Sequence, residues 1–380
     1  MRANLLKGKK ILILHDYFIY KGGGERLVIS LAKGLGAEIA TAFVAPDAFD
    51  PRKEGIKTRV LYRENFLSRL PGFRYLSVNW AFLTKTGFIR NYDVVIYSGD
   101  CLSALPRARG KVNIAYMHTP PRYLYDTYED RIKNYSLLKS WGFKAFTWLN
   151  RQRFDYLVRK LNLIITNSQN TRRRIKDYLG LDAAVVYPPG NTLNFKNLGY
   201  GDYFFSWARL FPEKRVDRIV AAFQKLPDKK LVVASGGLEL SKIKKMAQGY
   251  PNIQVLGYIS DAGLVRQLGS CLASIYVPLR EDFGMAAVES MAAGKPVIGV
   301  AEGGLLEIIE DGKNGILLKS DFTPEDLVKA VKSLTKDQAQ KMEKACYQTA
   351  KRFTEEEFWQ GMRRQISQLL AKETRIKSLK

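Results

Sequence analysis

Short apolar runs alternate with segments of helical periodicity along the whole chain, and this alternation constrains the fold more than any other feature. Each run stops at polar residues or at Gly and Pro, as the run KKILILH does before Asp16. Strands that are apolar throughout and separated by helices are typical of parallel sheets with helices on both faces. The strands predicted in the first half of the chain are 9–15, 92–99, 112–118, 161–168 and 183–189.

The segment 188–202 (PPGNTLNFKNLGYGD) interrupts this pattern with Pro, Gly and Asn and is the predicted linker. At roughly 100–200 residues per domain, 380 residues are enough for two domains. We therefore predict an α/β protein with two doubly wound parallel-sheet domains, 1–190 and 200–353, and a helix in 354–380 that packs back toward the first. The other predicted strands are 202–208, 230–237, 253–260, 271–277 and 295–301, and the clearest helices are 22–35, 216–226, 324–334 and 355–370.

Composition excludes several classes of protein. Hydrophobic residues make up 46% of the chain and aromatic residues 12%, which excludes a disordered chain. Three widely separated cysteines predict buried thiols in a reducing compartment. The N-terminal apolar run Ile11 to Leu14 is too short for a signal peptide, and no stretch of about 18 apolar residues predicts a spanning helix. We expect a cytoplasmic protein that is peripheral at the inner face of the cell membrane.

The net charge of +24 is concentrated in one half of the chain. Residues 1–200 hold 33 Lys and Arg against 15 Asp and Glu, a net +18, whereas residues 201–380 hold 28 against 22, a net +6. A basic half of this kind predicts a polyanionic partner, which is nucleic acid, anionic lipid or a phosphorylated substrate.

Residues 51–91 carry nine Lys and Arg, two Glu and several aromatic residues. Basic and aromatic residues together suit an anionic membrane surface, with Trp80 or Phe82 entering the headgroups. The same pattern also fits a helix with one face in the core and a solvated basic face, and the sequence leaves both interpretations open.

Ligands of open parallel sheets bind beyond the carboxyl ends of the strands, so the residues that follow strands are the informative ones. Gly22, Gly23 and Gly24 follow the first strand and open a helix, where free amides favour an anion, although a simple tight turn is an alternative. Arg209 and Lys214 follow a later strand and precede a helix. They form either a clamp for a diphosphate or a solvated cluster of charges.

Two glutamates stand eight residues apart in the segment 278–299, with Phe283, Gly284 and Met285 between them. Glu281 is predicted in the loop after a strand, and Glu289 two turns into the next helix on a face of small residues. A carboxylate among small apolar residues is costly unless it accepts hydrogen bonds. Vicinal hydroxyls of a sugar are natural donors for it.

Both histidines of the chain, His15 and His118, end predicted strands. Each is either a structural hydrogen-bonding group or part of a site. The sequence does not favour metal ligation, because neither histidine has a second His or Cys nearby. The sequence contains no D-x-D pair for a metal-bound nucleotide and no G-x-S-x-G nucleophile. Hydrolase classes therefore lose support, and no metal site is expected.

These motifs occur in an order that resembles glycosyltransferase family 4. The resemblance rests on E-x7-E with F-G-M inside, a preceding R-L-x-x-x-K and an N-terminal Gly-Gly loop, and it covers nearly the whole chain. It implies a retaining enzyme of the GT-B fold, which has two facing Rossmann-like domains. The segments HTPPRYLYD, TNSQNTRRRIKDYLG and VVYPP are similar to bacterial mannosyltransferases of polysaccharide and O-antigen synthesis. One departure is 188–195, where these enzymes more often carry an acidic residue after the two prolines.

The resemblance also implies roles for individual residues of the donor site. Amides of Gly23 and Gly24 would face the donor diphosphate, which Arg209 and Lys214 would hold from the other domain. Glu289 would accept from the ribose hydroxyls. The remaining implied contacts are Glu281 and His118 at the reacting sugar, amides of Phe283, Gly284 and Met285 at sugar or phosphate, Gly257, Tyr258 and Ile259 along the nucleobase, and Asp261 at its edge.

The function that follows is a retaining hexosyltransferase that uses a nucleotide-sugar donor, with mannose from GDP-mannose as the expected donor. The expected acceptor is lipid-linked or a polysaccharide at an anionic membrane, and no cofactor, metal or nucleic acid is expected. One alternative is a sugar-nucleotide 2-epimerase of similar fold, which would leave the basic half unexplained. A second is a basic nucleic-acid-binding protein, which would leave the two glutamates without a purpose.

Overall fold

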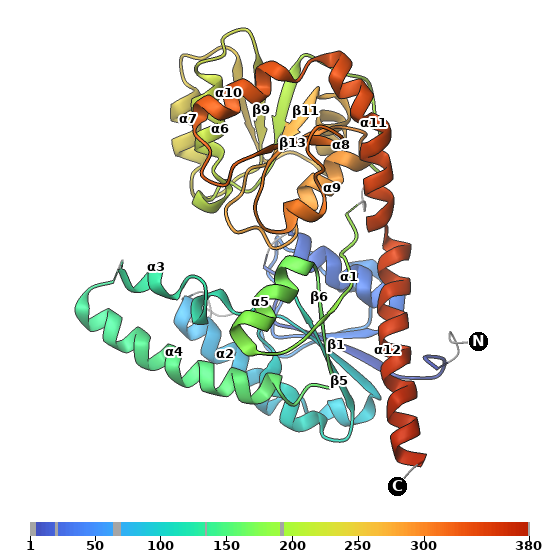
Figure 1. The fold of residues 1–380 in the computed structure, drawn as a ribbon. Coiled ribbons are helices and arrows are strands. Elements are labelled where there is room, and N and C mark those ends of the chain that lie inside the picture. The colour runs from blue at the N-terminus through green and yellow to red at the C-terminus, as the bar shows by residue number, and fades with distance from the viewer. Residues whose placement is uncertain (1–4, 20–21, 64–69, 134, 191–193, 379–380) are drawn as a thin grey trace. The chain divides into compact units, whose positions relative to one another are not determined.

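The chain divides into two compact units. Unit 1 comprises Met1–Tyr187 together with Phe358–Lys380, and unit 2 comprises Pro188–Glu357. The computed structural model describes residues 5–19, 22–63, 70–133, 135–190 and 194–378 (Figure 1). Unit 1 ends where the sequence changes to the Pro- and Gly-rich segment 188–202.

Unit 1 is built on a sheet of seven strands in the order β3-β2-β1-β4-β5-β6-β7, and every neighbouring pair is parallel. The order reverses direction between β1 and β4, which is the point where ligands bind in open parallel sheets. The strands are β1 (Ile11–His15), β2 (Glu38–Thr41), β3 (Thr58–Val60), β4 (Val94–Ser98), β5 (Val112–Met117), β6 (Leu163–Thr166) and β7 (Ala184–Val185).

Alternate residues of each central strand face opposite sides of this sheet, and both sides are covered. Ile11 and Ile13 of β1 belong to an apolar core with α1 and α12, while Leu12 and Leu14 belong to a second core with α2, α4 and α5. This arrangement explains why the central strands are apolar throughout. The helices are α1 (Gly23–Leu35), α2 (Pro71–Thr84), α3 (Tyr128–Lys133), α4 (Leu137–Val158), α5 (Gln169–Leu179) and α12 (Glu355–Ser378).

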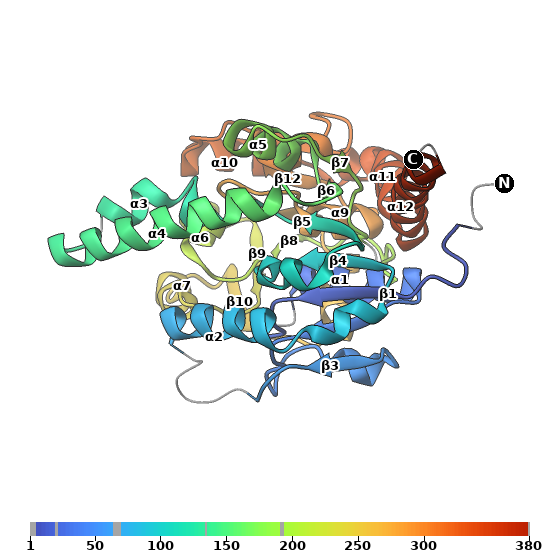
Figure 2. The same ribbon diagram turned by 90° about the horizontal axis from the view of Figure 1, so that it is seen from below.

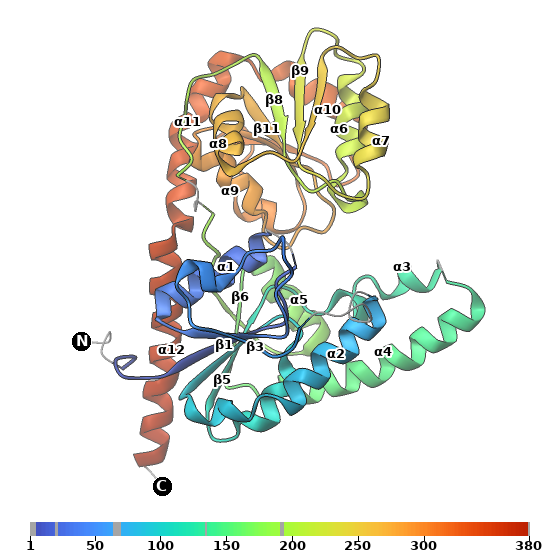
Figure 3. The same cartoon turned by 180° about the vertical axis from the view of Figure 1, so that it is seen from behind.

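The C-terminal helix α12 packs against α1 (Figure 3). Phe358, Met362 and Ile366 are buried in the core that α1 shares. The indole nitrogen of Trp359 donates to the carbonyl of Ser30 over 2.9 Å, and its ring lies where a Cβ at Gly34 would be 2.1 Å away. A glycine at position 34 is therefore what lets the two helices approach.

Helix α2 lies within the basic, aromatic segment 51–91, and it has one face in the core and one face exposed. Val78 and Phe82 face the core, whereas Phe73, Leu76 and Trp80 are exposed. The expectation that Phe82 enters a membrane is wrong, because the helical period places it on the inward face beside Val78. The outward face is apolar rather than basic.

Unit 2 contains six parallel strands in the order β10-β9-β8-β11-β12-β13. Its order reverses between β8 and β11, so β8 and β11 flank the predicted ligand position. The strands are β8 (Tyr203–Ser206), β9 (Lys230–Ala234), β10 (Ile253–Gly257), β11 (Ala273–Ile275), β12 (Val297–Val300) and β13 (Gly315–Leu318).

Helices of unit 2 pack in two groups, α6 with α7 and α10, and α9 with α11. The three cysteines of the chain are free and buried, as predicted. In the described part of the chain, no helix combines the length and apolar character needed to cross a membrane. The helices are α6 (Val216–Phe223), α7 (Leu240–Ala247), α8 (Asp261–Ser270), α9 (Met285–Ala292), α10 (Pro324–Ser333) and α11 (Lys336–Ala350).

Candidate functional site

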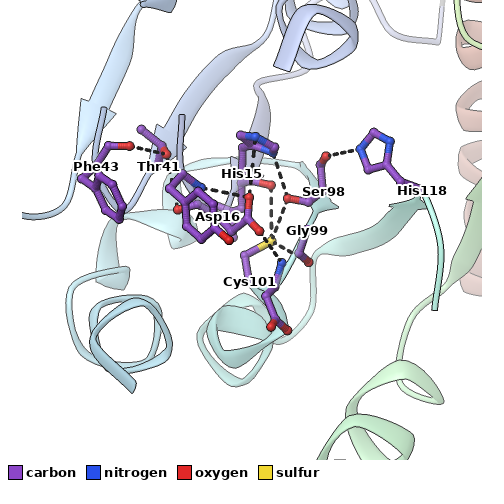
Figure 4. Close-up of polar contacts among 11 residues, drawn as sticks. His15, Asp16, Thr41, Phe43, Ser98, Gly99, Cys101 and His118 are labelled. Carbon is purple, nitrogen blue, oxygen red and sulfur yellow. Dashed lines mark hydrogen bonds and ion pairs between the residues drawn. The ribbon is translucent and has the colours of Figure 1, made fainter. Parts of the chain in front are cut away.

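Each of the two units presents a group of polar side chains where its central strands end. In unit 1, β1, β4 and β5 are neighbours, so the residues that end them converge. Nε2 of His118 lies 2.9 Å from the hydroxyl of Ser98, and Nδ1 of His15 lies 3.1 Å from the Ser98 carbonyl oxygen. Figure 4 shows His118 turned toward Ser98, with His15 on the other side of the same residue. The fold therefore brings both histidines to one place.

Burial keeps both imidazoles neutral at pH 7. Burial, with a smaller contribution from the nearby His15, lowers the pKa of His118 to about 4. Burial also lowers the pKa of His15, although Glu25 opposes this change. A neutral imidazole has one donor and one acceptor, so it suits a hydroxyl group better than it suits a phosphate.

Two carboxyl groups stand beside these histidines. Asp16 accepts from the amide of Tyr17 over 2.9 Å and from the amide of Asp100 over 3.3 Å. Burial raises the pKa of Asp16 to about 6, and burial together with Asp16 raises the pKa of Asp100 to about 7. Gly99 permits this approach, because a Cβ there would lie 2.5 Å from the Asp16 carboxyl carbon. The sequence analysis did not select either aspartate, although each directly follows a predicted strand or its last glycine.

Cys101 lies next to the same acids without reactive character. Its thiol donates to the carbonyl of Leu14 over 3.3 Å (Figure 4). Burial and the neighbouring Asp16 raise its pKa well above the ordinary value of a thiol. A cysteine held as a thiol is a poor nucleophile, so this residue has a packing role.

The glycine loop of unit 1 opens α1, as its sequence predicted. Gly22 is the N-cap with extended backbone, and α1 begins at Gly23. A Cβ at Gly24 would meet no other atom of the chain within 4 Å, whereas one at Gly22 would lie 2.7 Å from the Glu25 carboxylate. The helix start is thus uncovered at Gly24 and bordered by a carboxylate at Gly22.

In unit 2, the structure joins two residues that the sequence analysis treated separately. Nζ of Lys214 lies 2.6 Å from a carboxylate oxygen of Glu281, and their side chains are each 17% exposed. The hydroxyl of Tyr276 donates to the same oxygen over 2.7 Å. Burial, together with the nearby charge of Glu281, raises the pKa of Tyr276 well above its usual range. Lys214 follows β8, and Tyr276 and Glu281 follow β11, so the adjacency of these strands creates the cluster.

Arg209 stands nearer the end of β8 than Lys214 and is exposed. Its guanidinium carbon lies 5.4 Å from the centre of the Phe211 ring. A guanidinium that stacks on an aromatic ring presents a planar fork of donors, whose geometry matches an oxyanion. Arg209 and Lys214 thus supply cations beside the same strand end.

The loop that carries Glu281 is fixed by groups that the sequence analysis missed. Buried Arg215 donates to the carbonyls of Val277 over 2.7 Å and Pro278 over 2.9 Å. A Cβ at Gly303 would lie 2.2 Å from the Glu281 carbonyl oxygen, and one at Gly304 would lie 2.4 Å from Cα of Phe283. Gly303 and Gly304, which follow β12, could have predicted this contact from the sequence, because glycines allow one backbone segment to approach another.

Helix α9 begins directly after this loop. Gly284 has φ +104 and a Cβ there would lie 2.6 Å from Leu305, so no other residue fits easily. Gly284 is the N-cap and cannot cap the helix with a side chain. Since α9 begins at Met285, Glu289 lies one turn into the helix and not two. Its carboxylate accepts from the indole nitrogen of Trp207 over 3.1 Å, a partner that the sequence did not suggest.

The predicted nucleobase border lies at the end of β10. Gly257 has φ +71, and the next residue, Tyr258, is 80% exposed. The Tyr258 ring rests where a Cβ at Gly236 would be only 2.2 Å away. Ile259 follows, and Asp261 begins α8 after the N-cap Ser260. An exposed ring over a glycine turn is a flat surface of the kind on which a base can stack.

Within the described ranges, no three His, Cys, Asp or Glu side chains gather closely enough to hold a metal ion. The Asp16 and Asp100 pair is therefore an acid pair beside histidines and not a metal site with three such ligands.

Comparison with known proteins gives matches over most of the chain. Residues 21–195 match a family model described as Glycosyltransferase Family 4, and residues 196–353 match one described as Glycosyl transferases group 1. The two matches meet within the segment 188–202 and cover most of both units.

Two curated relatives transfer mannose according to their names. The human alpha-1,3/1,6-mannosyltransferase ALG2 is 24% identical over an alignment that covers 95% of this chain and 96% of that enzyme. A GDP-mannose-dependent alpha-(1-6)-phosphatidylinositol dimannoside mannosyltransferase of Mycobacterium tuberculosis is 35% identical over 33% of each chain. Among solved structures, the Anabaena HepE protein in complex with UDP-glucose is 18% identical with a TM-score of 0.72, covering 95% of this chain and 100% of that one. This last likeness shows the fold alone.

Proposed function

The chain belongs to glycosyltransferase family 4 and is a hexosyltransferase with the predicted GT-B fold, and we propose that it transfers mannose from GDP-mannose with retention of configuration. The proposed acceptor is a lipid-linked sugar or a polysaccharide at the cytoplasmic face of the membrane. In this proposal unit 2 supplies most of the contacts to the donor, and unit 1 is the acceptor side.

The Lys214–Glu281–Tyr276 cluster carries the proposal. A nucleotide sugar needs cations for its diphosphate and hydrogen-bond acceptors for its hydroxyls, and this cluster holds both kinds within 2.6–3.1 Å. Arg209 adds a second cation at the same strand end. When a donor binds, Lys214 can exchange its contact with Glu281 for one with a phosphate oxygen. Glu281 can then accept from a sugar hydroxyl.

The other donor contacts follow from the same unit. Glu289 accepts from the ribose hydroxyls with one oxygen while Trp207 holds the other. Amides of Phe283, Gly284 and Met285 face sugar or phosphate at the start of α9, where the helix dipole favours negative charge. The nucleobase lies along Gly257, Tyr258 and Ile259, with Asp261 at its edge.

The reaction breaks the bond between the sugar C1 and the diphosphate oxygen and forms a bond from C1 to the acceptor oxygen on the same face. The acceptor proton passes to the leaving diphosphate. Arg209, Lys214 and the amides of Gly23 and Gly24 stabilise the charge that develops there. His118, neutral at pH 7 and positioned by Ser98, contacts a hydroxyl of the reacting sugar.

Mannose is supported by the names of two relatives, whereas the HepE structure contains UDP-glucose. A thermal-unfolding screen with GDP-mannose, UDP-glucose, UDP-N-acetylglucosamine and UDP-galactose distinguishes the donors, because a bound ligand stabilises the folded state. We expect the largest rise in Tm with GDP-mannose. A larger rise with a UDP-sugar would replace the proposed donor.

Transfer itself is tested by release of the nucleoside diphosphate. We expect release to accelerate when a mannose-terminated lipid-linked acceptor is added. Release that is equally fast without any acceptor, together with a 2-epimerised sugar, would instead indicate an epimerase.

We propose an anionic membrane as the surface where the acceptor is met. The support is the net +18 of residues 1–200, since each basic residue near such a surface contributes about 1 kcal/mol. Reversal of Arg63, Arg69 and Arg74 to Glu should weaken sedimentation with phosphatidylglycerol vesicles and leave donor affinity unchanged. Arg69 lies outside the described residues, so Arg63→Glu with Arg74→Glu is the variant that the structure supports. Equal binding of wild type and variant would contradict the charge argument.

A further inference from the structure

Helix α4 of unit 1 carries a long stripe of apolar side chains that its own core does not use. Its members are exposed by 61–84% although all are Leu, Trp or Tyr. At 100° per residue they fall within an arc of about 120° along roughly 30 Å of helix. They are Leu137, Leu138, Trp141, Trp148, Leu149 and Tyr156, and we name them the α4 stripe.

The opposite face of α4 supplies the residues that pack into the core of unit 1. The ring of Phe146 lies 5.3 Å from that of Tyr75 on α2, and the ring of Phe143 lies 5.3 Å from that of Tyr135. Leu157 and Val158 are buried in the core below. The stripe thus adds nothing to the folding of unit 1, and an exposed apolar surface of this size marks a contact with something outside the chain.

Charges along α4 indicate what that contact is. Exposed Lys144 and Arg151 border one side of the stripe, and Lys139 lies beyond the other side. The helix has one acidic residue, Asp155, and its carboxylate accepts from the hydroxyl of Tyr125 over 2.7 Å. The short α3 that precedes it carries acids and bases in equal number. The surface around the stripe is therefore cationic.

Trp, Tyr and Leu flanked by Lys and Arg is the composition of a helix that lies in the plane of an anionic membrane. A second copy of this chain fits less well, because a two-fold contact through the stripe would bring the same cations together. Figures 1 and 2 show α4 extending beyond the other helices of unit 1, as a docking element must.

We infer that the α4 stripe is a membrane-insertion surface, which lies in the interface of an anionic bilayer while Lys144 and Arg151 contact its headgroups. The inference deepens the proposed membrane-linked function, and it differs from the attraction by the net charge of residues 1–200 because it requires apolar burial. Insertion is measurable without turnover, so it can fail or hold independently of the enzyme's donor or acceptor.

The test compares two matched substitutions in the full-length protein. Leu138 is 84% exposed in the stripe, and Leu238 in unit 2 is 81% exposed, so Leu138→Glu and Leu238→Glu make the same change at equal exposure. Both are sedimented with vesicles of phosphatidylglycerol and phosphatidylethanolamine, and with vesicles of phosphatidylcholine. We expect Leu138→Glu to weaken binding to the anionic vesicles at least tenfold and Leu238→Glu to leave it unchanged.

Three further measurements make the test decisive. Unfolding of Leu138→Glu should match wild type, because the side chain is exposed. Trp141→Ser should also weaken binding, whereas Trp141→Phe should retain most of it, which separates apolar insertion from added charge. The rise in Tm with the donor should be the same in wild type and in the α4 variants. Equal losses in Leu138→Glu and Leu238→Glu would overturn the inference, as would a wild-type dimer in light scattering that Leu138→Glu converts to a monomer. Absence of vesicle binding by an active wild type would overturn it too and leave the glycosyltransferase proposal standing.

Discussion

In unit 2 the side chains that follow β8 and β11 are charged and paired, whereas in unit 1 those that follow β1, β4 and β5 are shifted toward their neutral forms. Lys214 and Glu281 form an ion pair that solvent reaches, and Arg209 is exposed beside it. Asp100 and His118 are half-buried, and loss of solvation moves the pKa of the acid to about 7 and of the imidazole to about 4. Two sheets of one architecture thus present different chemistry at their carboxyl ends.

We propose that this difference corresponds to the two substrates of a glycosyl transfer. A diphosphate is bound by positive charges, and unit 2 places the side chains of Arg209 and Lys214 beside one strand end. Hydroxyl groups need neutral donors and acceptors, and burial in unit 1 provides these from groups that are ordinarily charged.

Loss of Arg209 should have the largest effect. The guanidinium of Arg209 would face negative charge that develops only as the donor bond breaks. Arg209→Ala should therefore raise the activation free energy by about 2–4 kcal/mol, which lowers kcat/KM roughly 30- to 1,000-fold. Lys225→Ala removes an exposed cation that pairs with Glu325 in the same unit, and should leave kcat/KM within about twofold. Steady-state kinetics measures both. An Arg209→Ala enzyme as active as Lys225→Ala would remove the charge argument from unit 2.

Substitution of Glu281 and substitution of Glu289 should change different kinetic constants. Glu281→Ala should lower kcat by about tenfold to a hundredfold, since contacts to the reacting sugar strengthen in the transition state. Glu289→Ala should mainly raise the donor KM, because ribose contacts are similar in both states. Donor titrations of the two variants compare kcat with KM. A raised KM alone in both variants would contradict the separate roles.

Asp100 should make unit 1 less stable as pH rises. Its pKa in the folded state is about 7, above the ordinary 3.8 of the unfolded chain, so between these values the folded state alone holds the proton. Stability is therefore full below pH 3.8 and is lost as pH rises toward 7, by on the order of 2–3 kcal/mol between pH 5 and pH 8. Asp100→Asn should remove this part of the slope. Denaturant unfolding at several pH values checks it.

The control for that experiment is Asp337→Asn, because Asp337 is an exposed acid paired with Lys341 on α11. It should leave the pH profile of wild type unchanged. The neutral His118 acts in the opposite sense, since its lowered pKa costs stability as pH falls below 6.5, and for that reason the difference between wild type and Asp100→Asn is the informative quantity. Asp16, whose pKa is raised to about 6, keeps a smaller slope of the same sign in this variant. A slope in Asp100→Asn as steep as that of wild type would show that Asp100 is ionised in the folded protein.

The sequence predicted the elements whose pattern is local. Central strands such as β1 and β4 are buried on both faces, so their continuous apolar runs were recognisable. The short strands β2, β3 and β13 were missed, and β3, a half-exposed Thr-Arg-Val at the edge of its sheet, has no apolar run at all. Helix α4 was missed because it is apolar on two opposite faces, which removes the helical period from its sequence.

Contacts between strands explain what the sequence could not supply about the site. Lys214 and Glu281 are 67 residues apart and meet only because β8 and β11 are neighbours. Asp16 and Asp100 are 84 residues apart and meet because β1 and β4 are neighbours. No spacing motif encodes such a pair, whereas the F-G-M segment and the glycine loop lie within single stretches of chain.

The smallest expected effect is that of a chelator. The sequence has no D-x-D pair, and unit 2 instead offers Arg209, Lys214 and the uncapped start of α9 to the leaving diphosphate. These groups stabilise negative charge without a cation from solution. Excess EDTA should therefore leave kcat within about twofold, and added Mg²⁺ or Mn²⁺ should not raise it. Arg209→Ala sharpens the test, because Mg²⁺ would partly restore this variant if the lost charge lies at the diphosphate. Abolition of wild-type turnover by EDTA and its recovery with Mg²⁺ would show that a metal does the work assigned here to the cations of unit 2.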